Sequence, residues 1–495
     1  MGDLPLLTIL VFLPLAGALC LLPVWRHDRA VRWIAAGFAG VELLLAGRLC
    51  LCPPTPLPAG TGLPGFLLWE DASWISRFGI RYTLGLDGIS LLMVLLTAFI
   101  TLIGMVVSWR AITERVALHY ALLLVMETGI MGVFLSLDLF LFYLFWEIML
   151  IPMFFLIGVW GHGRRIYSAM KFFIYTLAGS LLMLLAIIGV YLIHGRQTGV
   201  YSFALGDLLH TAIDPTLGVW LFGAFLLAFA IKFPIFPLHT WLPDAHTDAP
   251  TAGSVILAGL LLKTGAYGLV RFGYPLFPAA ARELTPLLLV CAVIGIVYGS
   301  WVAFAQTDMK RMVAYSSVGH MGFVALGIAA WSPVALSGAV LQMVNHGVTT
   351  GALFAAVGML DERVHTRDID AFGGLWGKVP VFAFFFLLFS MASAGLPGLN
   401  NFTGEFLILL GAFRTVPLAA IIAFTGIVLT LIYTVRLVQE LLFQEEQRTL
   451  LLSDLGLREG GLLALLAIIA VYIGVHPAPL LEILKLPVGL LTGTH

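Results

Sequence analysis

The sequence predicts an all-α polytopic membrane protein with about 14 transmembrane helices. Of its 495 residues, 60% are hydrophobic and only 11% are charged, and the mean hydropathy is +1.02. Long apolar runs recur along the whole chain, and about 20 apolar residues in a helix span a bilayer. Together these three observations exclude a soluble protein. The formal net charge of -1 provides no basic surface for nucleic acid.

Applied along the chain, the length rule predicts fourteen spans. Their approximate cores are residues 4–22, 31–49, 84–108, 117–135, 139–159, 167–193, 217–238, 251–272, 285–304, 312–330, 334–359, 379–413, 417–443 and 461–475. The start, MGDLPLL, carries an acid and no basic residue, so it is interpreted as the first span and not as a secretory signal. The longest connections are residues 50–83, rich in proline and glycine, and 194–216, so no large soluble domain is predicted.

The four cysteines indicate neither a metal site nor a redox site. Cys20, Cys50, Cys52 and Cys291 form no CxxC pair and have no metal-like spacing. We interpret them as small apolar residues in the helix packing, and we expect no cofactor and no metal in this chain.

The distribution of basic residues predicts the orientation of the chain. Lysine and arginine are about twice as frequent in the connections after odd-numbered spans as in those after even-numbered spans. Because basic loops stay on the cytoplasmic side, both termini are expected on the opposite side. For a bacterial inner membrane this is the periplasmic side.

The stretch IKFPIFPLHTWLPDAHTDAPTAGS, residues 231–254, combines features that are costly inside a membrane. Lys232 ends an apolar run, and Pro234 and Pro237 remove backbone donors where the seventh helix crosses the bilayer. A charged residue at the bilayer centre costs about 2.5–3.5 kcal/mol on insertion scales and is usually functional. Irregular backbone at that depth is tolerated where it is buried in protein or faces a wet cavity. The stretch therefore predicts a discontinuous helix beside a polar path.

The twelfth span has the same combination. Gly395, Pro397 and Gly398 directly precede Glu405 in ASAGLPGLNNFTGEFLILL. We expect a second discontinuous helix here. The alternative is a proline kink that ordinary packing absorbs.

The intramembrane charges predict an internal repeat. Glu147 and His320, Lys232 and Glu405, and Lys263 and Arg436 are each 173 residues apart, and each pair lies five spans apart. A unit of five spans is odd, so the second copy enters the membrane from the opposite side, as in inverted-repeat transporters. The predicted organisation is residues 1–116 for helices 1–3, 117–273 for the first repeat, 284–443 for the inverted second repeat and 444–495 for helix 14.

Glu147 and Lys232 are predicted to form a charge pair. At an effective dielectric constant near 20, unit charges about 4 Å apart interact by about 4 kcal/mol. Moving the carboxylate towards or away from the ammonium would switch Lys232 between holding and releasing a proton. The alternative for Glu147 is a protonated carboxyl satisfied by a neighbour.

Lys263, His320 and His346 lie in the middle of the eighth, tenth and eleventh spans. Lys263 is too far from either helix end to reach the interface. Histidine exchanges protons near neutral pH, so the two histidines are predicted to relay protons between Lys263 and Glu405. Packing histidines are the alternative, and metal binding is disfavoured because no carboxylate or cysteine lies at ligand spacing.

Other polar residues allow two interpretations. His239, His246, Asp244 and Asp248 follow Lys232 and are expected either to form a proton funnel or to solvate a turn. Glu127 is expected to pair with a neighbouring span or with an adjoining subunit. Asp138, at the start of the fifth span, is predicted to cap its helix.

These motifs resemble the antiporter-like membrane subunits of respiratory complex I. They are K-x-P-x-x-P-x-H-x-W-L-P-x-A-H-x-x-A-P from Lys232 to Pro250, FWE at Glu147, LLLKTG at Lys263, AYSSVGHMG around His320 and GLPGLNNFTGEF before Glu405. The resemblance covers nearly all of spans four to thirteen. Glutamate at position 405 is similar to the M-like branch, whereas the L-like and N-like paralogues carry lysine there.

The resemblance implies a function and a set of partners. It implies fourteen helices with inverted five-helix repeats, and a midplane proton route lined by six residues, namely Glu147, Lys232, Lys263, His320, His346 and Glu405. It also implies a non-redox subunit of a proton-translocating NADH:quinone oxidoreductase, in contact with L-like and N-like subunits and the lipid bilayer. NADH, FMN, iron–sulfur clusters and quinone are then expected in partner subunits. Arg436 is not part of the family route.

Three alternatives to this function stay open. The first is a subunit of a multisubunit cation/proton antiporter that exchanges Na⁺ or K⁺ against H⁺. The second is a passive scaffold whose buried charges only hold subunits together. The third is a subunit of a related membrane-bound hydrogenase.

Overall fold

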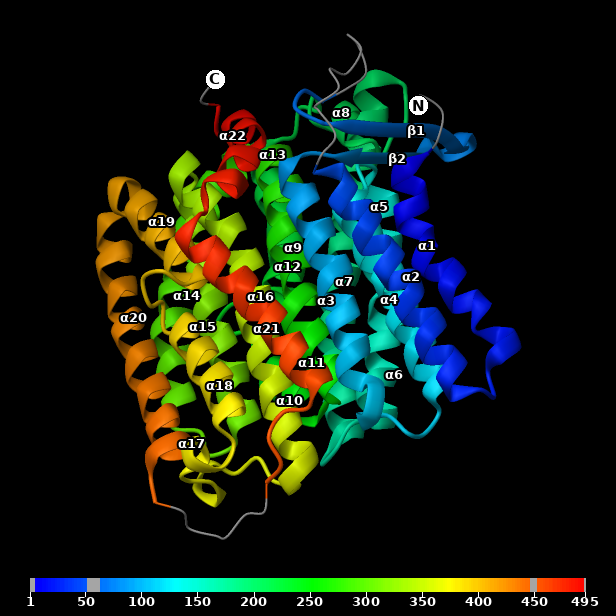
Figure 1. Cartoon of the computed structure of the whole chain (residues 1–495). Coiled ribbons are helices and arrows are strands. Elements are labelled where there is room, and N and C mark those ends of the chain that lie inside the picture. Colours follow the sequence, from blue (N-terminus) through cyan, green and yellow to red (C-terminus); the bar gives the residue numbers. More distant parts are fainter. Residues whose placement is uncertain (1–4, 51–62, 446–451, 494–495) are drawn as a thin grey trace.

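The fold is a bundle of long helices with a small β-hairpin at one end (Figure 1). The computed structural model describes residues 5–50, 63–445 and 452–493. Within those residues, 13 helices are long and apolar enough to cross a membrane. The prediction of a polytopic helical membrane protein is confirmed. The hairpin was not predicted.

The helices follow the predicted spans closely. The long segments are α1 (Leu6–Cys20) with η1 (Leu22–Val24), α2 (Asp28–Leu49), α3 (Gly88–Ala111), α4 (Val116–Leu135), α5 (Leu139–Ile148) with α6 (Leu150–Trp160), α7 (Arg165–Thr198), α9 (Pro215–Lys232), α14 (Pro278–Phe304), α15 (Met309–Ala330), α16 (Pro333–Val364), α20 (Pro417–Val438) with η6 (Gln439–Phe443), and α21 (Leu457–Val475). The eighth span consists of α11 (Thr251–Ile256), η3 (Leu257–Leu261), α12 (Leu262–Gly268), η4 (Leu269–Gly273) and α13 (Tyr274–Leu276). Shorter helices are η2 (Ser76–Phe78), α8 (Leu205–Leu208), α10 (Trp241–Asp248), η5 (Ile369–Ala371), α17 (Leu375–Lys378), α18 (Pro380–Ser393), α19 (Asn400–Thr415) and α22 (Ala478–Thr492).

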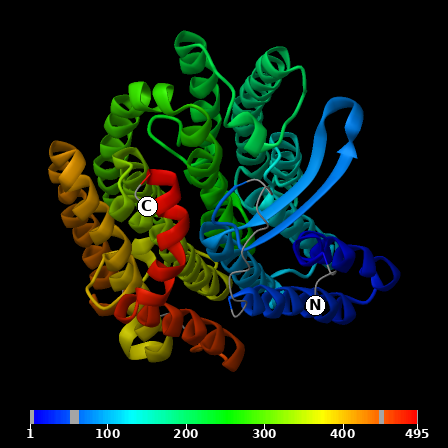
Figure 2. The same cartoon turned by 90° about the horizontal axis from the view of Figure 1, so that it is seen from above.

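The helices differ in how deeply they lie in the bundle. Seen from above, α1 and α2 lie on one side and α20 lies on another (Figure 2). In the span Thr251–Leu276 and in α16, all of the 18 most apolar consecutive residues are buried. The corresponding buried share is 28% in α2 and 33% in α20 with η6. The central helices carry Lys263 and His346, so the protein shields these side chains from lipid.

Aspartate caps begin several of the spans. Asp138 accepts hydrogen bonds from the backbone N–H groups of Phe140 at 2.9 Å and Leu141 at 3.0 Å. Asp87 and Asp308 cap α3 and α15 in the same way. A carboxylate satisfies free N–H groups and favours the positive end of the helix dipole, so these acids define where the helices start. The predicted capping role of Asp138 is confirmed.

The hairpin occupies part of the connection predicted between the second and third spans. Strand β1 (Leu68–Ile75) pairs antiparallel with β2 (Ile80–Leu86), so residues 84–86 are strand and not the predicted helix. Glu70 accepts hydrogen bonds from the N–H groups of Leu7 at 2.6 Å and Thr8 at 2.9 Å, which fastens β1 to the start of α1. Gly79 turns the chain with φ +67°, and a Cβ there would lie 1.8 Å from the carbonyl oxygen of Tyr201. Only glycine fits this turn.

The seventh and twelfth spans, which were expected to be discontinuous, each contain non-helical backbone. Helix α9 ends at Lys232, and α10 begins at Trp241 after the proline-containing segment. Helix α18 ends at Ser393 and α19 begins at Asn400, with Gly395 at φ +76° and Gly398 at φ +92° between them. The twelfth predicted span is therefore divided into two helices of 14 and 16 residues. Each is too short to count among the 13 long helices.

The fifth span has a milder interruption at Met149, between α5 and α6 and two residues after Glu147. Pro152 has no N–H group, and its ring crowds the carbonyl group of the residue four positions earlier, Ile148. The helix is interrupted at Met149 as a result.

Helix α22 is an addition to the predicted architecture. It follows α21 and packs against α3 and α16 at the end of the bundle that also holds the hairpin and the start of α1 (Figure 1). The approach to α3 is close, because a Cβ on Gly88 would lie 2.0 Å from the carbonyl oxygen of Ile483.

Candidate proton-transfer site

The centre of the site is Lys263, which is completely buried. Its Nζ donates a hydrogen bond to the carbonyl oxygen of Ala258 and lies 2.6 Å from Nδ1 of His346. Ala258 belongs to the π-helical turn η3, where the wider backbone turn leaves a carbonyl group accessible to a side chain. The local backbone of the eighth span therefore orients the lysine towards α16.

The contact with His346 couples the protonation of Lys263 to the tautomer of the imidazole ring. When Lys263 carries its proton, the ammonium group can only donate, so Nδ1 of His346 accepts and the proton of the neutral ring lies on Nε2. That Nε2 atom is buried and has no hydrogen-bond partner among the described residues. His346 is thus able to receive a proton on one nitrogen and release one from the other.

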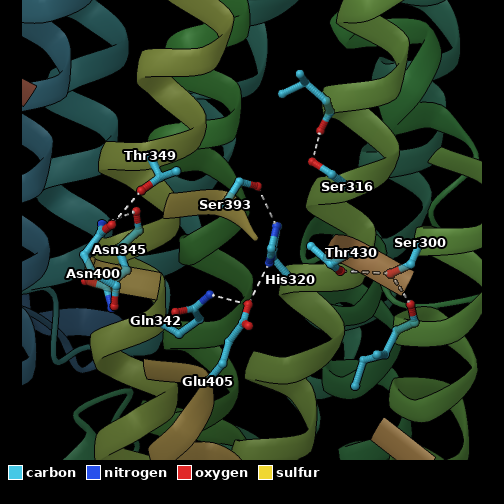
Figure 3. A network of polar contacts seen from close by, with 12 residues as sticks. Ser300, Ser316, His320, Gln342, Asn345, Thr349, Ser393, Asn400, Glu405 and Thr430 are labelled. Atoms are coloured by element: carbon cyan, nitrogen blue, oxygen red, sulfur yellow. Dashed lines mark hydrogen bonds and ion pairs between the residues drawn. The ribbon is translucent and has the colours of Figure 1, made fainter. Parts of the chain in front are cut away.

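His320 continues the series on α15. Its ring centroid lies 5.8 Å from that of His346. Its Nδ1 lies 2.8 Å from Oε1 of Glu405, and its Nε2 lies 3.1 Å from Oγ of Ser393 (Figure 3). Lys263, His346, His320 and Glu405 therefore form a continuous buried series across α12, α16, α15 and α19. The structure brings together four of the six predicted site residues in this way.

Amide and hydroxyl groups surround the Glu405 end of this series. Gln342 Nε2 donates to Oε1 of Glu405 at 3.0 Å (Figure 3). Nearby, Asn345 Nδ2 donates to the carbonyl oxygen of Asn400 at 2.7 Å, and Thr349 Oγ1 donates to Oδ1 of Asn400 at 2.9 Å. These bonds connect α16 to the first turn of α19 and so position Glu405.

Lys232 and Glu147 are close neighbours but do not form an ion pair. The Lys232 Nζ atom is buried, 5.3 Å from the ring centroid of Trp146 and 5.5 Å from that of Phe172. Glu147 interacts with it electrostatically without direct contact. Aromatic faces stabilise the ammonium by cation–π attraction in place of a contacting carboxylate. Glu147 is only partly buried, so it lies towards the outer surface of this chain.

The residues after Lys232 have different roles from one another. His246 is completely buried and its ring stacks on Phe354, with a centroid distance of 4.6 Å. It interacts electrostatically with Lys263, and both of its ring nitrogens lack a partner among the described residues. His239 is also buried. The idea that these two histidines solvate a turn is therefore wrong.

Asp244 and Asp248 hold α10 against α7. Asp244 forms an ion pair with Lys171 at 2.7 Å, and Asp248 accepts a hydrogen bond from Ser168 at 2.6 Å. These contacts give both carboxylates a structural task. They also fix the helix that carries His246.

Sequence reasoning missed Lys310, Gln342 and Glu42 as buried polar residues. Lys310 falls in the connection between the predicted spans 285–304 and 312–330, but it is 4% exposed and donates to the carbonyl oxygen of Ala249. Its position at the start of an apolar span was a weak signal of burial. Arg436, in contrast, is at the periphery, where it pairs with Glu440 at 2.8 Å, so its agreement with the 173-residue spacing does not place it in the series.

Residues 136–430 match the family described as NADH:quinone oxidoreductase/Mrp antiporter, transmembrane region. The chain belongs to this family. Among its curated relatives, NADH-quinone oxidoreductase subunit M of Pseudomonas aeruginosa is 45% identical over 482 residues, covering 96% of this chain and 95% of the relative. Subunit M of Escherichia coli strain K12 is 44% identical over 490 residues, covering 96% of each.

Solved structures agree with this assignment to the NADH:quinone oxidoreductase/Mrp antiporter family. A chain of respiratory complex I from Thermus thermophilus with bound NADH has a TM-score of 0.87 and 33% identity, covering 98% of this chain and 99% of that one. A chain of the Mrp complex from Dietzia has a TM-score of 0.84 at 20% identity, covering 98% and 97%, which shows the shared fold. The recognised resemblance to antiporter-like complex I subunits is confirmed. The protein is a membrane subunit of this family, and its relatives are subunits of an oxidoreductase complex.

Proposed function

We propose that this chain translocates protons along the series Glu147, Lys232, Lys263, His346, His320 and Glu405, as a non-redox subunit of an NADH:quinone oxidoreductase. The single observation that supports this best is the buried series from Lys263 to Glu405, in which each group contacts or closely approaches the next. Buried ionisable groups inside a membrane bundle are costly and are kept where they have a function.

The proposed transfer runs from the cytoplasmic side to the opposite side of the membrane. Protons from the cytoplasmic side reach Lys232, pass to Lys263, and move through the two histidines to Glu405 and outward. Between Lys263 and His346 the transfer is direct. His346 then releases the proton from Nε2 towards His320, across a gap that water bridges.

The driving force comes from quinone reduction in partner subunits. Each charge moved against 100 mV needs about 2.3 kcal/mol. Because Lys232 lies against aromatic rings in this structure, a movement of Glu147 towards it would complete the ion pair and stabilise the charged lysine. In this proposal, that movement couples the chain to its neighbours.

We also propose an internal repeat within the chain and a set of partner subunits around it. The spans four to eight and nine to thirteen form inverted repeats, with α9/α10 and α18/α19 as their discontinuous helices. The chain contacts L-like and N-like paralogues and the lipid bilayer of a bacterial inner membrane, with periplasmic termini. NADH, FMN, iron–sulfur clusters and quinone are bound by other subunits.

Replacing Lys263 with methionine tests the function. Methionine keeps much of the length and removes the proton-binding group. In the assembled complex reconstituted in liposomes, we expect quinone reduction to continue or slow while the number of protons moved per electron falls. Lys485→Met is the matched control, because the Lys485 side chain is 76% exposed on α22. An assembled Lys263→Met complex with the normal proton-to-electron ratio would support the scaffold alternative and refute the proposal.

A cation/proton antiporter is the second candidate function. The fold shared with a chain of the Mrp complex is the observation that favours it. It predicts that a Na⁺ or K⁺ gradient alone drives proton movement through the complex, without NADH. Proton movement that depends only on quinone reduction favours the first function.

A further inference from the structure

Helices α2, α3 and α4 enclose a group of acidic and hydroxyl side chains outside the proposed proton route. Glu42 is 0% exposed, and Glu127 and Thr101 are each 1% exposed. All five of their side-chain oxygens lack a hydrogen-bond partner among the described residues. Helix α2 packs against both α3 and α4, and α3 packs against α4. The two carboxyls interact electrostatically and the Thr101 hydroxyl lies beside the Glu127 carboxyl, so the three groups are neighbours.

The three side chains lie deep in the membrane. Arg32 near the start of α2 donates to the carbonyl oxygen of Ile112 at 3.0 Å, so the start of α2 lies beside the α3–α4 connection. At 1.5 Å per residue, Thr101 and Glu127 are about 15 Å from that end of the bundle and Glu42 is about 20 Å from it. The hydrocarbon core is about 30 Å thick, so the group is near its middle.

The group is separate from the Glu147 end of the route. On α4, Gly129 and Gly132 face α5 and the residue that follows it. A Cβ on Gly129 would lie 2.9 Å from Met149, and a Cβ on Gly132 would lie 2.1 Å from Phe145. Glu127 precedes Gly129 by two residues, a rotation of about 200° on a helix. The Glu127 side chain therefore points away from α5 and Glu147.

The other charged side chains near α4 either bind other groups or lie far from the two carboxyls. Lys263 on α12 is bound to His346 and Ala258. Arg32 and Arg110 lie towards the loop end of α2 and α3, and the described helices α1 and α6 carry no acidic or basic side chain. No described cation compensates two buried carboxylates here.

Two further polar side chains, Ser108 and His119, lie between the group and the α3–α4 connection. Ser108 precedes the end of α3, two helical turns from Thr101 and on the same face. Its Oγ lies 2.9 Å from Nε2 of His119, eight residues before Glu127 on α4. The Nδ1 atom of His119 is buried without a partner among the described residues. Ser108 and His119 therefore lie on the side of the two carboxyls that faces the α3–α4 connection.

We propose that Glu42, Glu127 and Thr101 form a second, off-route proton-binding site that exchanges protons with the α3–α4 side through Ser108 and His119. Two carboxylates cannot both stay ionised side by side in an apolar surrounding, so at least one holds a proton. In this proposal, water completes the hydrogen bonds of the carboxyl oxygens and carries the proton between them and His119. The protons bound belong to the pair, not to either residue alone.

Infrared difference spectroscopy on the assembled complex tests this site. Spectra are recorded between acidic and alkaline pH, in H₂O and in D₂O, for the unchanged complex, Glu42→Gln, Glu127→Gln and the control Glu283→Gln, whose side chain is exposed on α14. We expect a protonated-carboxyl band that shifts in D₂O. Each of the two buried substitutions should move the pH at which the remaining carboxyl titrates by at least about one pH unit, which is a tenfold change in proton concentration. The control should have no effect on this band.

Two hydroxyl variants test the site even if the glutamine variants fail to assemble. Thr101→Val keeps the shape and both carboxyls, and it should displace the frequency of the band. Ser108→Ala should slow its exchange with D₂O. Three results would overturn the proposal: no exchange with D₂O, independent titration of the two carboxyls, or loss of the band on adding Na⁺ at constant pH, which would identify a cation site.

Discussion

Replacing Glu405 with glutamine tests whether the route needs an ionisable group at its outer end. Oε1 of Glu405 accepts from His320 Nδ1 at 2.8 Å and from Gln342 Nε2 at 3.0 Å. Glutamine has the same shape, and its amide oxygen accepts both bonds. Bonds to a charged group contribute about 1.5–3 kcal/mol and neutral ones about 0.5–1.5 kcal/mol, so the variant loses about 2–3 kcal/mol of stability. It should still assemble.

Alanine at the same position has a different cost. It leaves His320 Nδ1 and Gln342 Nε2 buried without their acceptor, at about 1–3 kcal/mol each, and adds a cavity. The glutamine variant is therefore the informative one, because it separates the loss of a proton-binding group from the loss of structure. Glu405→Asp keeps the charge and should retain part of the function.

The assay measures protons moved per electron in liposomes, with quinone reduction followed in the same sample. We expect Glu405→Gln to lose the protons that depend on this subunit while the complex stays assembled. Glu482→Gln is the control, because the Glu482 side chain is 76% exposed on α22. A Glu405→Gln complex with the unchanged proton-to-electron ratio would refute the assignment of Glu405 to the route.

Further predictions concern the ends of the spans. Arg271→Met should destabilise the chain by about 3–5 kcal/mol in thermal unfolding, because Asp87, 2.5 Å from Arg271, would stay buried without its partner. The double variant with Asp87→Asn removes the buried charge but keeps the N-cap of α3, so it should recover most of the loss. Gly79→Ala should lower the melting temperature, since its Cβ would overlap the carbonyl oxygen of Tyr201; an unchanged value would contradict the hairpin packing. Burial raises the pKa of Asp138 to about 6, above the value near 4 of an unfolded chain. Its stabilising contribution is therefore complete below about pH 4 and is lost as pH rises through about 6, and Asp138→Asn should flatten the melting temperature over that range.

Local sequence was a good guide to the spans. The apolar runs predicted where most of the spans lie, and Asp138 predicted where α5 begins, because each signal depends on residues near one another in the chain. Two features depend on distant residues and were missed. The hairpin is fastened by Glu70 to the start of α1, and α22 packs against Gly88 of α3.

The candidate site was predicted in its members but not in its contacts. Residue type and depth in an apolar run identified Lys263, His320, His346 and Glu405. The absence of a direct Lys232–Glu147 ion pair, and the burial of Lys310 and Glu42, depend on which helices pack together. No local pattern in one sequence encodes that packing.

By itself the sequence determined that this chain crosses a membrane many times and carries ionisable groups at the depth of the lipid tails, because hydropathy and charge act through composition over about 20 residues. Only the tertiary structure decided which of those groups meet. His346 contacts Lys263 because a π-helical turn presents the lysine to α16, and Glu42 approaches Glu127 because α2 packs beside α4. The physical reason is that a hydrogen bond or a shared proton requires contact at a few Å, and that distance is set by helix packing.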